Sequence, residues 1–235
     1  MALKIKVYSD GADLKSMIEM NGNATVQGLT TNPTLMKKSG VTDYRAFCKE
    51  VLTHVKVKPV SFEVFADDFH EMERQALEIA TWGKNVYVKI PITNTEGQST
   101  IPLIKKLSSS GVALNVTALL TLNQVIETAA ALKGGAPSIV SVFAGRIADT
   151  GRDPIPMMQA SVEICAAADP KMELLWASSR EVLNIVQADS IGCQIITVTA
   201  DLIRKLSGLG KDLTQLSLET VRMFKQDSDS AGFVL

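Results

Sequence analysis

The chain is poor in the residues that mark several large protein classes. Aromatic residues make up 5% of its 235 residues, which disfavours a surface that stacks nucleic-acid bases. Lysine and arginine number 24 against 25 aspartates and glutamates, and the resulting net charge of -1 argues against nucleic-acid or anionic-membrane partners. No apolar run approaches the length of a membrane span, and residues 1–7 lack the long apolar region of a secretory signal.

Cysteine and histidine are also scarce. Cys48, Cys165 and Cys193 are odd in number and widely spaced, which is typical of reduced, buried thiols in a cytoplasmic protein rather than of a disulfide framework. His54 and His70 stand alone, without another cysteine or histidine at metal-ligand spacing, so we expect no metal site. The glycine-rich phosphate motifs G-x-G-x-x-G and the P-loop are absent as well.

The rest of the composition is that of a globular chain with a sizeable core. Hydrophobic residues make up 46% and charged residues 21%, which excludes a disordered chain. For a chain of this mass, folding is expected to reduce the accessible surface from roughly 37,000 Å² to roughly 10,000 Å², which is enough to form a sizeable core. No linker-like stretch divides the sequence, because 108–111 and 133–137 are typical of turns before strands. We therefore expect residues 1–235 to form one domain.

Eight short β-branched runs recur along the chain, with helix-period segments between most of them. Strands are predicted at 5–8, 26–29, 60–65, 86–90, 112–116, 139–143, 172–176 and 194–198. Helices are predicted at 69–82, 99–107, 121–132, 156–168 and 180–188. Some strands are apolar on both faces, as in a parallel sheet covered by helices. The fold class is therefore α/β, and eight alternating strands predict a (β/α)8 TIM barrel, with a doubly wound open sheet as the alternative.

A further amphipathic pattern at 213–224 follows the last predicted strand, and a polar tail follows that pattern. We therefore expect 212–235 to be a C-terminal helix and tail outside the barrel. Such a helix can act as a lid, contact another subunit, or pack against the barrel wall, and the pattern does not choose among these.

Polar residues at the C-terminal ends of the strands are candidate site residues, because that end of a (β/α)8 barrel carries its chemistry. Asn115 and Thr117 share one strand face, as do Ser141 and Phe143, so the polar side chains gather in one place. For Thr199 and Asp201, which follow the last strand, capping of the next helix is the alternative. The other candidates are Asp10, Thr30, Thr31, Asn32, Glu63, Lys89, Arg146, Ser178, Ser179 and Arg180.

Lys89 is the most informative of these residues, because it lies between apolar neighbours in the strand 86–90. Burial without full pairing disfavours the charged ammonium and favours a neutral, nucleophilic amine, which a Schiff-base lysine requires. The alternative is a lysine that reaches solvent or pairs with a carboxylate. Glu63 is similarly placed in 60–65, and either pairs with Lys89 or acts as an acid and base through a water.

Two arginines and an asparagine also follow strand ends. Arg146 and Arg180 can clamp a phosphate with their guanidinium groups, or form two surface salt bridges. Pro33 forces Asn32 into an extended backbone and suits the first position of a helix. Asn32 therefore either caps that helix or points its amide at a ligand hydroxyl.

Seven short motifs follow one another in order at the predicted strand ends. They are Tyr8-Ser-Asp10, Gly28-Leu-Thr-Thr-Asn-Pro-Thr34, Phe62-Glu63-Val64, Tyr87-Val-Lys-Ile-Pro91, Leu114-Asn-Val-Thr117, Ser141-Val-Phe-Ala-Gly-Arg146 and Trp176-Ala-Ser-Ser-Arg180. With these motifs nearly the whole chain resembles the transaldolase family of class I aldolases, particularly its short-chain members related to fructose-6-phosphate aldolase.

The resemblance implies a (β/α)8 barrel with a Schiff-base lysine on the fourth strand, a position that Lys89 matches. Lys89 would attack the ketone of fructose 6-phosphate or sedoheptulose 7-phosphate, while Glu63 and Thr117 shuttle protons through a water. Asp10 would take the proton of the hydroxyl beyond the scissile bond. A dihydroxyacetone unit would remain on Lys89 until an aldose phosphate such as erythrose 4-phosphate accepts it. No metal or organic cofactor is implied.

The resemblance also assigns the binding residues and the assembly. Asn32, Asn115 and Ser141 would hold the dihydroxyacetone hydroxyls, and the phosphate would be held by Arg146, Arg180 and Ser178. The family implies an enzyme of the pentose phosphate pathway. Its short members form homo-oligomers, in which the C-terminal helix reaches a neighbouring subunit and closes pentamers that pair into decamers.

Glu63 and Phe143 bear on the choice between transfer and simple aldol cleavage. The similar fructose-6-phosphate aldolases typically carry glutamine and tyrosine at these positions, so the resemblance favours transfer. The alternatives are an aldolase of that kind and a non-catalytic barrel that binds a sugar phosphate. Ser179 replaces an aromatic residue that is frequent in the family, and marks a point where the phosphate pocket or the acceptor preference can differ.

Overall fold

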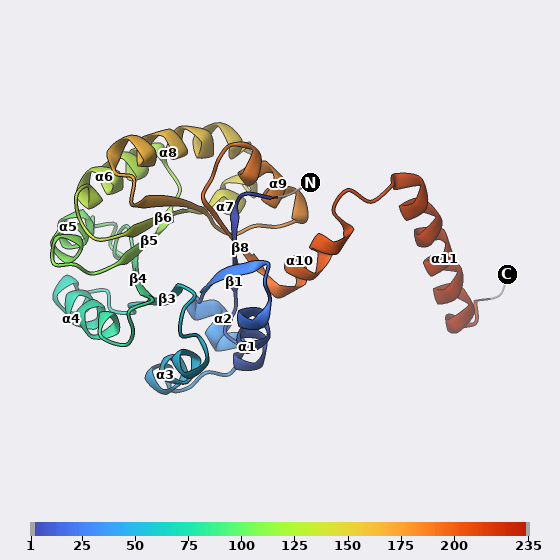
Figure 1. Ribbon diagram of the computed structural model, residues 1–235, viewed down its shortest axis with the longest axis horizontal. Helices are drawn as coiled ribbons and strands as arrows, with labels where there is room; N and C mark the ends of the chain where they lie inside the picture. The colour runs from blue at the N-terminus through green and yellow to red at the C-terminus, as the bar shows by residue number, and fades with distance from the viewer. Residues whose placement is uncertain (1–2, 234–235) are drawn as a thin grey trace.

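Eight parallel strands close into a barrel in the computed structural model, which describes residues 3–233 (Figure 1). The strands are β1 (Lys6–Asp10), β2 (Val26–Thr30), β3 (Val60–Glu63), β4 (Val86–Pro91), β5 (Leu114–Leu119), β6 (Ser138–Val142), β7 (Met172–Trp176) and β8 (Ile195–Thr199). They are hydrogen-bonded in chain order, and β1 pairs with both β2 and β8. The predicted (β/α)8 barrel is confirmed, and the alternative of an open, doubly wound sheet is wrong.

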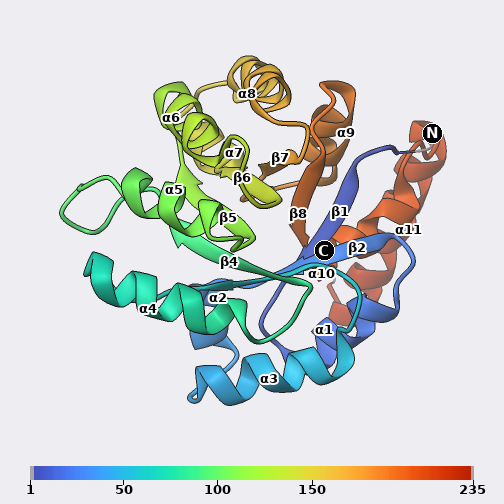
Figure 2. The same cartoon turned by 60° about the vertical axis from the view of Figure 1, so that its left-hand side comes forward.

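Helices surround the barrel between successive strands (Figures 1 and 2). They are α1 (Leu14–Gly22), α2 (Pro33–Lys38), α3 (Tyr44–His54), α4 (Phe69–Ala80), α5 (Ile101–Ser109), α6 (Leu122–Leu132), α7 (Ala144–Ala148), α8 (Ile155–Ala168), α9 (Val182–Ser190) and α10 (Ala200–Lys205), followed by a short 3-10 turn, η1 (Leu206–Gly208). Local chemistry starts several of them, since Asp13, Asp43 and Asp68 each accept a backbone N–H in the first turn. The predicted strands and helices overlap the observed ones.

Two apolar clusters hold the barrel together. Phe62 and Trp176 belong to the larger cluster, which joins the strands to the surrounding helices. Tyr8 belongs to the smaller one, together with Ile139 and Leu175. The predicted buried thiols are present as well, and desolvation by burial raises the pKa values of Cys48, Cys165 and Cys193 to about 12. These thiols behave as core residues and not as nucleophiles.

The helix α11 (Leu213–Ala231) stands away from the barrel (Figure 1). It ends at Gly232, whose φ of 67° closes the helix in the left-handed conformation. The helix predicted at 213–224 is present, but it continues to Ala231. The polar tail contains no proline or glycine before Gly232 that would end it earlier. No residue of α11 is buried. For the part of the chain that the structure describes, the alternative that this helix packs against the barrel wall is therefore wrong.

The first two and last two residues of the predicted domain 1–235, and so the end of the predicted segment 212–235, lie outside the described residues. The extent of a single domain over 1–235 stays a prediction. Within 3–233, no helix combines the length and the hydrophobicity that crossing a membrane requires.

Candidate active site

A cavity of about 470 Å³ opens at the C-terminal ends of the strands. All of the residues predicted for catalysis or substrate binding line this cavity, and they come from β1 to β7 or from the segments that directly follow these strands. They are Asp10, Asn32, Glu63, Lys89, Asn115, Thr117, Ser141, Phe143, Arg146, Ser178 and Arg180. The structure therefore brings these residues together, while the further candidates Thr31 and Asp201 do not line the cavity, and the role of each residue stays a prediction.

Lys89 is buried at the end of β4, with a relative exposure of 8%. Its Nζ donates to the backbone carbonyl oxygen of Thr31 at 3.0 Å and lies 3.3 Å from a carboxylate oxygen of Glu63. The pairing follows from the sheet, because the register of β3 and β4 sets Glu63 directly beside Lys89. Lys89 thus lies beside a carboxylate and does not reach solvent, and its action as a nucleophile stays a prediction.

The backbone of Glu63 is held by the side chain of Tyr44, the first residue of α3. The hydroxyl of Tyr44 donates to the backbone carbonyl oxygen of Glu63 at 2.9 Å. Its ring packs edge-on against Phe65, with 4.3 Å between the ring centroids. Burial, with a smaller contribution from the neighbouring Cys48, raises the pKa of Tyr44 far above its usual value, so the hydroxyl remains a donor.

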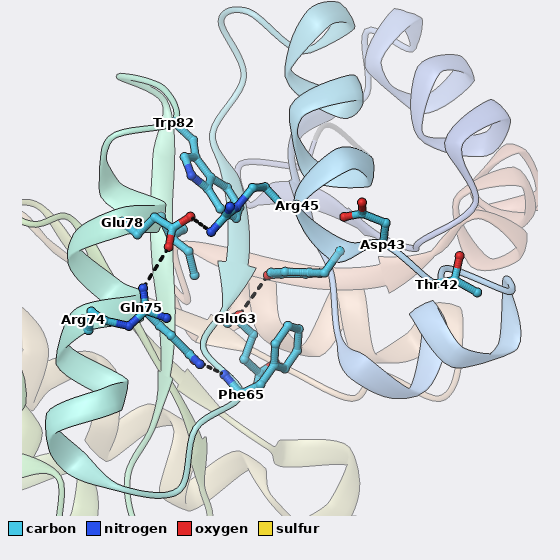
Figure 3. Close-up of a pocket in the computed structure, with 11 residues that line it drawn as sticks. Thr42, Asp43, Arg45, Glu63, Phe65, Arg74, Gln75, Glu78 and Trp82 are labelled. Atoms are coloured by element: carbon cyan, nitrogen blue, oxygen red, sulfur yellow. Dashed lines mark hydrogen bonds and ion pairs between the residues drawn. The ribbon is translucent and has the colours of Figure 1, made fainter.

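That tyrosine also borders a second cavity, of about 510 Å³, between α3 and α4 (Figure 3). Its two arginines are already engaged, because Arg45 pairs with Glu78 and Arg74 pairs with the same carboxylate at 3.2 Å. Glu63 is the one predicted site residue that lines it among those the structure describes. Glu63 also lines the cavity at the strand ends, so the two cavities share this residue as a wall.

Asp10 accepts two hydrogen bonds at the end of β1. The hydroxyl of Thr30 donates to its Oδ1 at 2.9 Å, and the amide of Asn32 donates to its Oδ2 at 3.1 Å. Desolvation by burial raises the pKa of Asp10 above its usual value, although Lys89 and both hydrogen bonds oppose the shift. A carboxylate with a raised pKa suits proton transfer to and from a substrate.

Asn32 caps the following helix and also presents its amide to the cavity, so its two predicted positions are compatible. Its Oδ1 accepts the backbone N–H of Leu35 at 2.9 Å and caps α2, while its Nδ2 faces Asp10 in the cavity. Thr199 lines the cavity too but makes no capping hydrogen bond, and Asp201 lies outside it, paired with Arg204 on the surface.

A buried polar network lies beside Lys89. Asn115 donates to the hydroxyl of Ser61 at 3.0 Å and accepts from the hydroxyl of Ser141 at 2.6 Å. The hydroxyl of Thr117 lines the cavity and is buried, and it has no hydrogen-bond partner among the described residues. Because an unpaired buried hydroxyl costs about 1–3 kcal/mol, Thr117 is a group that a bound substrate or water would satisfy.

The two predicted arginines line the same cavity from the segments after β6 and β7. The guanidinium of Arg146 lies 5.4 Å from the ring centroid of Phe143. The guanidinium of Arg180 pairs with Asp149, and both side chains are half exposed. Arg180 thus forms the surface salt bridge of its second alternative, while the phosphate clamp stays a prediction that its place at the cavity allows.

Strained backbone occurs twice at the cavity. Ala118 has a φ of 65° at the end of β5, and Ser178 has a φ of 61° after β7. Non-glycine residues pay roughly 1–2 kcal/mol for this conformation, and backbone strain of this kind tends to cluster at functional sites. Gly145 supports the second of them, because its N–H donates to Ala177 at 3.2 Å and an added Cβ would overlap the carbonyl group of Ser178.

Sequence reasoning missed several residues of this region. Ser61 and Thr197 lie inside strands, where serine and threonine between apolar residues give no signal of function. Gly145 and Asp149 lie on either side of Arg146 but not at a strand end. Ser179 lines the cavity as predicted, and its hydroxyl donates to the backbone carbonyl oxygen of Thr197 at 2.9 Å.

Among residues 3–233, no three or more histidine, cysteine, aspartate or glutamate side chains gather in a group able to hold a metal ion.

The chain is similar in sequence to one described family and to several curated proteins. The family model described as "Transaldolase/Fructose-6-phosphate aldolase" matches residues 7–235. A "Probable transaldolase" of Thermoanaerobacter sp. (strain X514) is 34% identical over 228 residues, covering 97% of this chain and 99% of that protein. A "Probable transaldolase" of Dehalococcoides mccartyi is 35% identical, covering 86% of this chain and 90% of its own. A "Probable transaldolase" of Methanococcus vannielii is 34% identical, covering 92% of this chain and 94% of that protein.

Proposed function

Because the chain belongs to the transaldolase/fructose-6-phosphate aldolase family, and so is an aldolase- or transaldolase-type enzyme, we propose that it transfers a dihydroxyacetone unit through a Schiff base on Lys89. Fructose 6-phosphate or sedoheptulose 7-phosphate is the proposed donor, and an aldose phosphate such as erythrose 4-phosphate is the acceptor. The observation that carries the proposal is the buried amine of Lys89, 3.3 Å from Glu63 in the cavity at the strand ends.

Imine formation requires that the amine lose a proton and that the substrate lose water. In the proposed mechanism, Glu63 takes the proton of the Lys89 ammonium, and the free amine adds to the ketone carbon. The carbinolamine hydroxyl then leaves as water after receiving a proton from Glu63, with the hydroxyl of Thr117 guiding the transfer. The short distance between Lys89 and Glu63 and the unpartnered hydroxyl of Thr117 support these roles.

Carbon–carbon cleavage follows on the protonated imine. Asp10 takes the proton of the hydroxyl beyond the scissile bond, this hydroxyl becomes the carbonyl of the leaving aldose phosphate, and the bonding electrons move into the imine to form an enamine. The acceptor aldehyde then reverses these steps, with Asp10 returning the proton. The pKa of Asp10, raised by burial, supports this exchange, because a weaker acid is a better base once it is ionised.

The binding residues divide by chemistry. Asn32, Asn115 and Ser141 offer amides and a hydroxyl to the dihydroxyacetone hydroxyls. The guanidinium groups of Arg146 and Arg180 offer charge and directed N–H groups to the phosphate, and Ser178 adjoins Arg180 along the cavity wall. Phe143 lies beneath Arg146 and, unlike tyrosine, brings no hydroxyl to the enamine, which favours transfer over release.

The proposed assembly is a homo-oligomer, a pentamer or decamer, in which α11 contacts a neighbouring subunit. Leu213, Val221 and Phe224 are exposed on this helix, at 77%, 60% and 62%, and exposed apolar side chains gathered on one element are typical of a contact surface. A cytoplasmic location and a place in the pentose phosphate pathway complete the proposal. The location rests on the pattern of the three cysteines, and the pathway rests on the family.

The test is to trap the imine. The protein is incubated with fructose 6-phosphate and reduced with borohydride, and intact and peptide masses are measured. We expect a dihydroxyacetone-sized adduct on the peptide that holds Lys89, lost when erythrose 4-phosphate is added before reduction. Lys89→Met should abolish the adduct, and Lys105→Met, at an exposed lysine, should retain it.

Two results would change the assignment. No adduct with either ketose phosphate, in protein shown to be folded, would overturn the Schiff-base mechanism. Cleavage that turns over equally fast without an acceptor would replace the transferase with an aldolase of the fructose-6-phosphate kind.

A further inference from the structure

Two threonine hydroxyls form a buried chain behind Asp10. The hydroxyl of Thr30 donates to Oδ1 of Asp10 at 2.9 Å and lies 2.6 Å from the hydroxyl of Thr197. Thr30 is 2% exposed and Thr197 is 7% exposed. The barrel brings them together, because β1, which carries Asp10, is paired with β2 on one side and with β8 on the other.

The direction of this chain follows from counting hydrogens, since a hydroxyl has one hydrogen to donate. When Asp10 is ionised, Thr30 gives its hydrogen to Oδ1, so Thr197 must donate to Thr30. When Oδ1 carries a proton, it donates to Thr30, and Thr30 must turn its own hydrogen toward Thr197. Thr197 is therefore a donor in one state and an acceptor in the other, which a hydroxyl can satisfy and a methyl group cannot.

We propose that Thr197 is a positioning residue for the reaction, and that with Thr30 it forms a reversible hydroxyl chain that keeps Asp10 hydrogen-bonded in both of its protonation states. This rests on the proposed function, in which Asp10 takes up and returns the proton of the substrate hydroxyl. No proton leaves Asp10 along the chain; both hydroxyls only rotate. The hydroxyl of Ser179, which donates to the backbone carbonyl of Thr197, helps to hold that residue in place.

The electrostatic surroundings of Asp10 make the two hydroxyls important. The charged groups that share its cavity are Lys89 on β4, Glu63 on β3, and Arg146 and Arg180 after β6 and β7. The flanking strands β2 and β8 contain no charged residue, so they act on Asp10 through uncharged groups. Those groups are Thr30 and, one step behind it, Thr197.

Replacing each threonine by valine, which has the same shape without the hydroxyl, should move the pKa of Asp10 in opposite directions. Thr30→Val removes a donor to the ionised carboxylate, so the pKa should rise. Thr197→Val leaves that donor but removes the partner of Thr30 in both states. The ionised state only leaves the Thr30 oxygen with one acceptor site unused, whereas the protonated state leaves its O–H without an acceptor, which costs more, so the pKa should fall. Each shift should be about one pH unit, the order expected for one neutral hydrogen bond.

The experiment measures single-turnover release of the aldose phosphate from fructose 6-phosphate as a function of pH. Because Asp10 works as a base, activity is lost as the pH falls through its pKa. The acid limb should therefore move to lower pH in Thr197→Val and to higher pH in Thr30→Val. Thr197→Ser, which restores the hydroxyl, should return the limb to its wild-type position even if the valine variant folds poorly. Thr128→Val is the control, because Thr128 is a buried threonine of α6 without a hydrogen-bond partner among the described residues.

Borohydride trapping of free dihydroxyacetone on Lys89 separates this inference from the function beneath it, because that adduct forms without carbon–carbon cleavage. Variants that trap dihydroxyacetone like the wild type, with acid limbs displaced in opposite directions, support the chain. Normal trapping with limbs that coincide or move in the same direction overturns the inference and leaves the proposed function standing. Wild-type protein that is folded and traps nothing overturns both.

Discussion

Gly145→Ala is expected to disable the phosphate side of the cavity while leaving Lys89 in place. The added Cβ would lie 2.6 Å from the carbonyl carbon of Ser178 and would overlap its carbonyl oxygen. Ser178 already has a left-handed φ of 61°, so its peptide has little freedom to rotate out of the way. The segment that leads to Arg180 must therefore shift as a whole.

The size of the effect follows from the overlap. The added Cβ would lie 1.6 Å from the Ser178 carbonyl oxygen, and contacts of a Cβ are essentially never shorter than 3.0 Å, so the peptide must retreat by at least 1.4 Å. A misplacement of about 1 Å in a substrate-positioning group already costs on the order of 100-fold in rate. Overpacking of this kind destabilises a protein by about 1–3 kcal/mol, which is less than the total stability of about 5–15 kcal/mol of a typical domain. Gly145→Ala should therefore fold and lose about 100-fold in kcat/KM for a ketose phosphate.

The assay compares a substrate with a phosphate to one without. Transfer from fructose 6-phosphate should fall strongly, whereas borohydride trapping of dihydroxyacetone, which carries no phosphate, should stay near the wild-type level. Gly22→Ala is the matched control, since a Cβ on this last residue of α1 meets no atom of the described residues within 4 Å. The reasoning is refuted if folded Gly145→Ala keeps wild-type kcat/KM for fructose 6-phosphate, or if transfer and trapping fall equally.

Three further outcomes are expected. Lys89→Met should lower turnover by about 1,000-fold or more with the circular dichroism spectrum unchanged, because it removes the proposed nucleophile; residual turnover near the wild-type rate would count against the Schiff base. Phe143→Tyr should raise the release of free dihydroxyacetone relative to transfer, and an unchanged product ratio would argue against the role given to this position. Phe224→Ser, which removes an exposed apolar side chain of α11, should lower the mass measured by light scattering without lowering secondary-structure content; an unaltered mass would exclude this side chain from the proposed contact.

The barrel could be predicted from the sequence because its physical signals are local. Each strand is a short run of β-branched and apolar residues, and a parallel sheet buried on both faces requires that pattern. The ends of elements were harder to predict. β5 continues to Leu119 beyond the predicted run at 112–116, with Ala118 taking a left-handed φ that an apolar pattern does not reveal. α11 continues through a tail of polar residues, because exposed helices need no apolar stripe to continue.

The cavity could be predicted because a polar side chain at the end of a buried strand costs free energy unless it is paired or serves a function. Lys89 and Glu63 are polar residues among apolar neighbours, and the parallel register alone sets them side by side. The contacts around them could not be predicted in the same way. Ser61 of β3 meets Asn115 of β5 past the intervening β4, and Thr197 of β8 meets Thr30 of β2 past β1. Such pairs depend on distances between strands, for which a single sequence carries no signal.

Ser179 shows how the structure narrows a question that the sequence leaves open. As a departure from the aromatic residue frequent in the family, it pointed equally to the phosphate pocket and to acceptor preference. Arg180, the next residue, is fixed independently, because Asn184 accepts its backbone N–H at 2.8 Å and Asp149 pairs with its guanidinium. The hydroxyl of Ser179 is itself engaged with the backbone of Thr197. The small side chain therefore leaves Arg180, the proposed phosphate partner, in place and bears on the width of the cavity next to β8. Under the proposed function, this favours a difference in the acceptor over a difference in phosphate binding.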